Sequence, residues 1–230
     1  MNRTLSLIVL LASFAVATNS LHAAVVLTSS PLAPTPSGDD IYQLAGTLSA
    51  DDDDSGVWNN RPTQGQTFLT LSNPDGYLLN SITVKAFNTD GPEGYTVRIG
   101  TISGSVFTPV ASDTSNLLGA TANNFMTYTF GTPVLLNPNT QYAFDLHGLP
   151  ISPAGFRLVN NADPSSYLNG VAYSTNDGTN LIVRDFDRIF SLDLVAIQPI
   201  PAPAPEPGSA LLLGMGAMLL VVRGQRRQQG

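Results

Sequence analysis

The stretch Ser81-Ile82-Thr83-Val84-Lys85-Ala86-Phe87 alternates apolar and polar residues with a period of two. Successive side chains of an extended strand point to opposite faces, so Ile82, Val84 and Ala86 are expected to share one face. The residues between and after them are expected to share the other. This pattern predicts a β-strand with Thr83, Lys85 and Phe87 on the face opposite to Ile82, Val84 and Ala86.

Short runs of the same kind recur over residues 24–200, separated by glycine, proline, asparagine and aspartate, and none has the 3.6-residue period of a helix. We predict strands at 42–48, 66–71, 79–88, 96–102, 106–110, 125–130, 141–146, 155–159, 171–174 and 189–197. The number and spacing of these strands predict an all-β domain over residues 41–197, a two-sheet antiparallel sandwich of jelly-roll type. A single up-and-down barrel is the alternative. Residues 24–40 are expected to form an irregular lead-in, rich in proline and serine.

The charge of this central region is strongly negative. Six basic and sixteen acidic residues between 24 and 200 give a net charge of −10, against −7 for the whole chain. Such a surface disfavours nucleic acid and anionic membranes as partners. The chain has no cysteine, which excludes thiol catalysis, disulfides and cysteine metal sites. Stability must therefore come from the core.

The N-terminus has the layout of a secretory signal peptide over residues 1–23. Arg3 supplies the positive charge, and Leu5 to Val16 supply an apolar run of 12 residues. Small residues follow, and cleavage by signal peptidase is expected after Ala23 or Ala24. The alternative is an uncleaved N-terminal anchor.

The C-terminus combines three features. Residues 198–208 form a proline-rich linker that ends in Pro205-Glu206-Pro207, and proline at every second position favours an extended spacer. Residues 209–223 are expected to form a short transmembrane helix, since the 13 apolar residues at 210–222 span roughly 20 Å of a ~30 Å hydrocarbon layer. Residues 224–230 form a basic tail, and the three arginines Arg223, Arg226 and Arg227 are expected to stay cytoplasmic. The alternative is a buried C-terminal helix.

These three features together resemble the PEP-CTERM sorting signal of Gram-negative bacteria. The resemblance covers about the last 26 residues. It implies transient insertion in the inner membrane and cleavage near Pro205-Glu206-Pro207 by a membrane protease, an exosortase. The product is then expected to be released or transferred to the cell surface or the extracellular matrix.

A second resemblance covers roughly residues 60–197. The order of Gln64-Gly65-Gln66-Thr67-Phe68, then the run from Leu135 to Phe144, then Tyr167 to Tyr173 is similar to the choice-of-anchor extracellular domains of R type. That family implies a β-sandwich ectodomain displayed at the surface. It supplies no reaction and no catalytic residues.

Two kinds of ligand site deserve a test. Trp58 is the single tryptophan, and it either stacks on a sugar or caps the core. The acidic run 51–54, with Asp177, Asp185 and Asp187, offers hard oxygen ligands for a structural calcium ion. Asp185 and Asp187 are expected to face the same side of a strand. The spacing is not that of an EF-hand, and a solvated loop is the alternative.

The sequence gives little sign of catalysis, and we expect no enzymatic activity. Beyond the signal peptide His147 is the single histidine, without a G-x-S-x-G motif or a zinc motif. We therefore expect a structural or adhesive protein of the cell surface or extracellular matrix, associated with exopolysaccharide or biofilm. The alternative is a carbohydrate-binding module for an exopolysaccharide, and less favoured is a glycan hydrolase.

Overall fold

The alternating stretch lies in strand β5 (Tyr77–Lys85), the central strand of a five-stranded antiparallel sheet. The sheet has the order β1-β10-β5-β17-β2, with β1 (Val26–Ser30), β10 (Phe125–Leu136), β17 (Phe190–Ala196) and β2 (Ile41–Gln43). Ile82 and Val84 of β5 are fully buried, and so is Ala86 just beyond it. The three residues share one face, as predicted, and that face lies in the core.

This computed structural model describes residues 24–46, 56–57, 63–148, 156–161, 166–175 and 178–199. A second, six-stranded antiparallel sheet has the order β15-β14-β4-β11-β7-β8. Its strands are β15 (Leu181–Val183), β14 (Ala172–Thr175), β4 (Thr63–Leu69), β11 (Gln141–Gly148), β7 (Tyr95–Ser103) and β8 (Val106–Thr114). Three two-stranded pairs complete the fold: β3 (Gly56–Val57) with β12 (Phe156–Arg157), β13 (Asn160–Asn161) with β16 (Asp187–Arg188), and β6 (Pro92–Glu93) with β9 (Leu118–Gly119).

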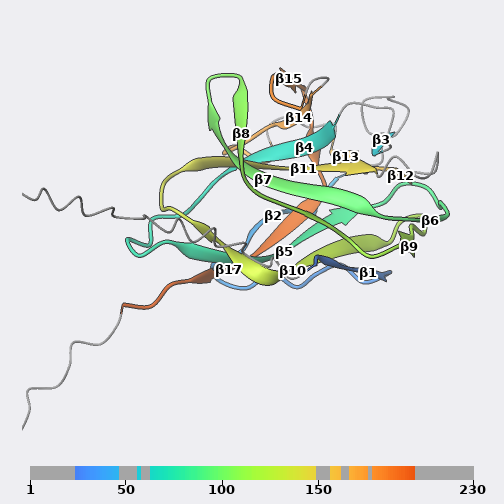
Figure 1. Cartoon of the computed structure of the whole chain (residues 1–230), viewed down its shortest axis with the longest axis horizontal. Helices are drawn as coiled ribbons and strands as arrows, with labels where there is room; N and C mark the ends of the chain where they lie inside the picture. Colours follow the sequence, from blue (N-terminus) through green and yellow to red (C-terminus); the bar gives the residue numbers. More distant parts are fainter. Residues whose placement is uncertain are drawn as a thin grey trace, which may run out of the picture. The chain divides into compact units, whose positions relative to one another are not determined.

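The main core lies between the two sheets, which Figure 1 shows as two layers. Leu79, Met126 and Leu192 come from the first sheet, and Val97 and Phe144 from the second; all are fully buried. Aromatic rings join the layers, since the ring centroids of Phe144 and Phe190 are 5.7 Å apart. The described part of the chain is therefore an all-β sandwich, as predicted.

Each of the ten predicted strands overlaps a strand of the structure. The lead-in prediction is wrong in part, because Val26–Ser30 form β1 instead of an irregular segment. Leu27 is buried against the core, and β1 adds to the edge of β10, a partner about 100 residues away in sequence. The up-and-down barrel is excluded, because β4 and β5 follow each other in the chain but lie in different sheets.

The predicted signal peptide and sorting helix lie outside the described residues, as does the linker from residue 200 onward. Within the residues that are described, no helix is both long and apolar enough to cross a bilayer.

The second sheet curls until its two edge strands meet. The amide of Phe107 in β8 donates to the carbonyl of Thr179 over 2.8 Å, and the amide of Leu181 in β15 donates to the carbonyl of Ser105 over 2.8 Å. This contact folds the hairpin of β7 and β8 over the outer face of the sheet. A small second core of Phe107, Ala143 and Tyr173 fills the space beneath it. The outer face of this sheet is therefore largely enclosed.

Candidate functional site

The register of the second sheet places one residue from each of four neighbouring strands in a row on its outer face. Tyr173 of β14 pairs with Gly65 of β4, Gly65 pairs with Asp145 of β11, and Asp145 pairs with Arg98 of β7. Gly65 matters because a Cβ there would lie 2.2 Å from the carbonyl oxygen of Phe144 and 2.6 Å from the Tyr173 ring. The missing side chain lets the Tyr173 ring lie across β4.

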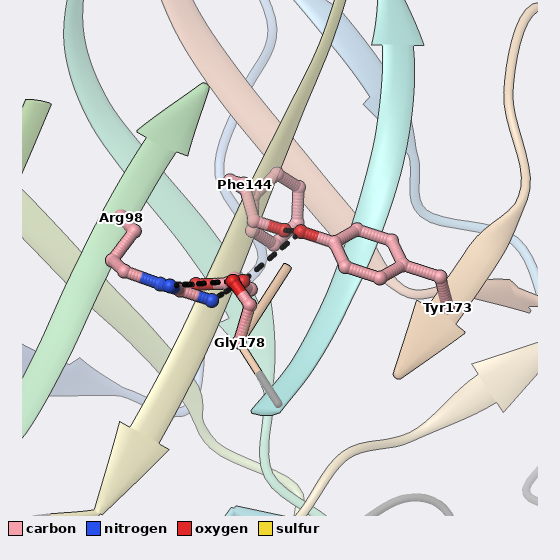
Figure 2. A network of polar contacts seen from close by, with 5 residues as sticks. Arg98, Phe144, Tyr173 and Gly178 are labelled. Atoms are coloured by element: carbon pink, nitrogen blue, oxygen red, sulfur yellow. Dashed lines mark hydrogen bonds and ion pairs between the residues drawn. The ribbon is translucent and has the colours of Figure 1, made fainter. Parts of the chain in front are cut away.

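Arg98, Asp145 and Tyr173 form a buried polar network on this row. Arg98 donates from Nε to Asp145 Oδ1 over 2.8 Å and from Nη2 to Oδ2 over 2.5 Å, a bidentate ion pair. Its Nη1 donates to the carbonyl of Gly178 over 2.9 Å. Figure 2 shows Tyr173 approaching from the opposite side, where its hydroxyl donates to Asp145 Oδ2 or to the carbonyl of Phe144. The network ties β7, β11, β14 and the 178 turn together.

Burial sets the electrostatics of this network. Desolvation raises the pKa of the Asp145 carboxyl, while the hydrogen bonds and charge of Arg98 oppose that rise. Burial lowers the pKa of Arg98, but the hydrogen bond and charge of Asp145 outweigh it, and the net pKa is raised. Burial, followed by the charge of Asp145, raises the pKa of Tyr173 well above its usual value. Tyr173 therefore stays protonated, and the guanidinium stays charged over the Phe107 ring, 4.9 Å from its centroid.

His147 lies two residues beyond Asp145 on the same face of β11. Its Nδ1 is buried and has no hydrogen-bond partner, and the hydroxyl of the buried Thr175 also lacks one. Burial, and then the positive charge of Arg98, lower the pKa of the imidazole. A serine-hydrolase triad needs a carboxylate that hydrogen-bonds this ring. Among the described residues no carboxylate hydrogen-bonds to His147.

A second polar feature lies on the outer face of the five-stranded sheet. It is a pocket of about 360 Å³ between the sheet and residues 34–40 of the lead-in. Its floor carries four hydroxyl side chains from three neighbouring strands: Ser81, Thr83, Thr127 and Ser191. Asp40 and Asp193 add two carboxylates at its side. No basic or aromatic residue of the described chain lines it.

Of the calcium candidates, the structure describes Asp185 and Asp187, and these two differ in their surroundings. Asp185 is exposed at a bend, whereas Asp187 in β16 is buried, so the prediction that both face one side of a strand is wrong. Asp187 accepts hydrogen bonds from Gln66 Nε2 at 2.9 Å, the Tyr167 amide at 3.1 Å and Ser166 Oγ at 3.3 Å. Its oxygens hold the 166–167 segment. Across the described residues no three acidic or histidine side chains group to hold a metal ion.

The other predicted site residues lie outside the described residues: Trp58, Asp177, the acidic run 51–54, Ala23, and the sorting residues Pro205, Glu206, Pro207, Arg223, Arg226 and Arg227. Ala24 is the first described residue and is exposed.

The sequence analysis did not single out the Arg98–Asp145 pair. The available signal was a lone charge inside each of two apolar strands, Thr96 to Ile102 and Gln141 to Leu146. A charge in such a position needs a partner when the strand is buried on both faces.

The aromatic side chains show how little stacking surface the domain presents. Of those whose exposure the structure describes, Tyr42 alone is exposed, at 51%. The others are buried or half-buried, and Tyr142 and Phe144 share the core face of β11. The described domain therefore has no row of exposed aromatics on a sheet face.

Comparisons with known proteins give distant structural similarity only. No family model and no curated protein matches the chain. It is similar in structure to a clostridial cysteine protease, Cwp84, after propeptide cleavage, with 12% identity, a TM-score of 0.46, and coverage of 71% of this chain and 42% of that one. It is also similar to a structure of the cysteine protease and lectin-like domains of Cwp84, a surface layer associated protein of Clostridium difficile. That match has 13% identity and a TM-score of 0.44, and it covers 71% of this chain and 37% of that one. The chain thus spans less than half the length of either structure.

Proposed function

We propose that this chain is an exported protein of a Gram-negative bacterium, held at the cell surface or in the extracellular matrix, where its β-sandwich has a structural or adhesive role. Signal peptidase and an exosortase-type protease process its two ends. The two ends of the sequence support this export and sorting. The apolar run from Leu5 to Val16 lies at the N-terminal end, and Pro205-Glu206-Pro207, with the apolar run and arginines that follow it, lies at the C-terminal end.

The observation that carries the structural role is the burial of the aromatic side chains. A carbohydrate-binding module that grips a polysaccharide chain needs several exposed rings in a row, whereas only Tyr42 among the described aromatics is exposed. The charged groups of the domain are used for stability, since Asp145 holds Arg98 and Asp187 holds the 166–167 segment. A non-enzymatic surface protein fits this use of polar groups better than a glycan hydrolase does.

The fold proposed in finer detail is a jelly roll. Eight strands in the orders β2-β17-β5-β10 and β4-β11-β7-β8 support it, because strands that follow in sequence, such as β4 and β5 or β10 and β11, alternate between the sheets. The strands β1, β14 and β15 extend the two sheets at their edges.

The test is to locate the protein in a Gram-negative host that has an exosortase and makes exopolysaccharide. We expect the full-length protein in the surface and matrix fraction, and a variant ending at residue 199 in the periplasm or the free medium. Deletion of the protein should weaken the cohesion of the matrix. Equal distribution of the two forms, with unchanged cohesion, would contradict the proposal.

A further inference from the structure

The pocket of the five-stranded sheet is built from hydroxyl side chains that the register brings together. Thr127 of β10 pairs with Thr83 of β5, and Thr83 pairs with Ser191 of β17. Ser81 lies two residues before Thr83 on the same strand and completes the floor. Such positions on the outer face of a sandwich are normally solvated, yet Ser81, Thr83 and Ser191 are at most 8% exposed. The lead-in that crosses above them accounts for this burial.

Residues 34–40 of the lead-in lie over the pocket floor and form its roof. Asp40 Oδ2 accepts the amide of Ser37 over 2.6 Å, and its Oδ1 accepts the amide of Leu194 over 3.0 Å. Leu194 follows the irregularity in the pairing of β17 with β5, where its amide needs another acceptor. The carboxylate of Asp39 accepts the amide of Ala196 over 3.3 Å in the same way. The roof is therefore held to β17 by hydrogen bonds from the backbone amides of Leu194 and Ala196 to the carboxylates of Asp40 and Asp39, and the pocket lies between roof and floor.

The floor retains hydrogen-bonding capacity. Thr83 and Thr127 bond to each other through their hydroxyls at 2.9 Å, but within the described chain the hydroxyls of Ser81 and Ser191 have no hydrogen-bond partner. Each can donate one hydrogen bond and accept two. Asp193 is exposed at the side of the pocket; its Oδ1 accepts from Asn80 Nδ2 over 3.5 Å and its Oδ2 adds an acceptor, whereas both oxygens of Asp40 are already used by the roof. An open pocket whose buried floor carries unused hydroxyls matches a ligand that is itself rich in hydroxyls.

Tyr42 supplies the apolar surface that such a ligand needs. It lies on β2 directly opposite Ser191, on the outer face of the sheet and beside the pocket floor. It is also the one exposed aromatic among those described, at 51%. The C–H face of a sugar ring packs well on an aromatic ring, while the sugar hydroxyls bond to polar neighbours. The volume of about 360 Å³ lies at the low end of small-molecule sites, which favours one sugar ring over a long chain.

The charge of the pocket selects among sugars. Its lining has two carboxylates, Asp40 and Asp193, and no basic side chain. A uronic acid or a sulfated sugar would meet like charges without a compensating partner. We propose that Tyr42, Ser81, Ser191 and Asp193 form a binding site for a single neutral sugar ring of an extracellular polysaccharide. This inference deepens the proposed adhesive function and rests on it for the source of the sugar.

The test is a binding titration of the full-length protein with neutral oligosaccharides of glucose, galactose and mannose, and with oligouronates of equal length. We expect binding to at least one neutral series and at least tenfold weaker binding to the oligouronates. Loss of two hydrogen bonds in Ser81→Ala/Ser191→Ala should weaken binding roughly tenfold or more, and Tyr42→Ala should do so to a similar degree. Thr129→Ala, an exposed residue of the same sheet face outside the pocket, is the matched control and should bind as the wild type does.

Thermal melting of each variant shows whether the fold is kept. Asp193→Asn should reduce the preference for neutral over acidic sugars, a result that a purely structural role of the residue would not give. Absence of binding to every neutral series, equal binding of oligouronates, or unchanged binding by both pocket variants would overturn the site. A wild-type protein that reaches the matrix but fails this titration would refute the sugar site and leave the proposed location intact.

Discussion

At the scale of single residues, the Arg98–Asp145 pair is a bidentate ion pair inside the domain. Asp145 is fully buried, and Arg98 makes two hydrogen bonds to it. Arg98→Met would leave a buried carboxylate without its partner, so we expect a loss of about 3–5 kcal/mol of unfolding free energy. Urea denaturation of the full-length protein measures this loss. The double variant Arg98→Met/Asp145→Leu removes both charges and should recover most of the stability. A loss below about 1 kcal/mol in the single variant would contradict this account.

The lowered pKa of His147 predicts the direction in which the stability of the domain depends on pH. Burial, and then the charge of Arg98, lower the pKa of His147 in the folded state below the ordinary value of 6.5. Below pH 6.5 the imidazole therefore binds a proton more readily in the unfolded chain than in the folded one. Stability should therefore be fully present above pH 6.5 and decrease as the pH falls below that value. His147→Gln removes this titration while the other groups remain. We expect the melting temperature of the wild type to fall more than that of the variant between pH 7.5 and 5.5. Parallel curves would contradict the role of His147.

At the scale of the elements, Gly65 decides how β4, β11 and β14 pack. An alanine Cβ there would lie 2.2 Å from the carbonyl oxygen of Phe144, which is backbone and cannot move aside easily. We expect Gly65→Ala to cost on the order of 2–3 kcal/mol and to displace the Tyr173 ring. Gly91→Ala is the matched control, because nothing lies within 4 Å of its Cβ position. Chemical denaturation of both variants measures the difference. Equal stabilities of the Gly65→Ala and Gly91→Ala variants would contradict the close packing at Gly65.

The elements also show what local sequence could and could not predict. The period-two alternation in β5 and in Phe125 to Phe130 of β10 is a local signal, and both strands were predicted correctly. Strand β1 was missed, because Val26 to Ser30 is short and its strand state depends on the distant edge of β10.

The candidate sites depend on register rather than on local pattern. Arg98 and Asp145 are 47 residues apart in the chain, and only the pairing of β7 with β11 makes them neighbours. The same holds for Thr127, Thr83 and Ser191 in the pocket. Each of these residues is ordinary in its own strand. A single sequence predicts the strands but not the order in which they lie.

At the scale of the whole molecule, the proposed function assigns export and sorting to the two ends of the chain and the extracellular role to the folded domain between them. The described residues form a closed sandwich whose polar groups stabilise the curled second sheet and fix the lead-in. The terminal segments carry the features of export and sorting in their sequence, and the domain between them carries a net charge of −10. A negatively charged domain of this kind would remain dispersed among matrix polymers until a specific contact holds it.

The central claim is that the tail is cut near Pro205-Glu206-Pro207 and the domain is then delivered outside the cell. The most direct measurement is the intact mass of the protein recovered from the surface and medium of an exosortase-containing host, for the wild type and for Glu206→Ala. We predict that the wild-type product lacks the basic C-terminus, and that Glu206→Ala remains at full C-terminal length in the membrane fraction. Identical masses and identical release of the two proteins would contradict the claim.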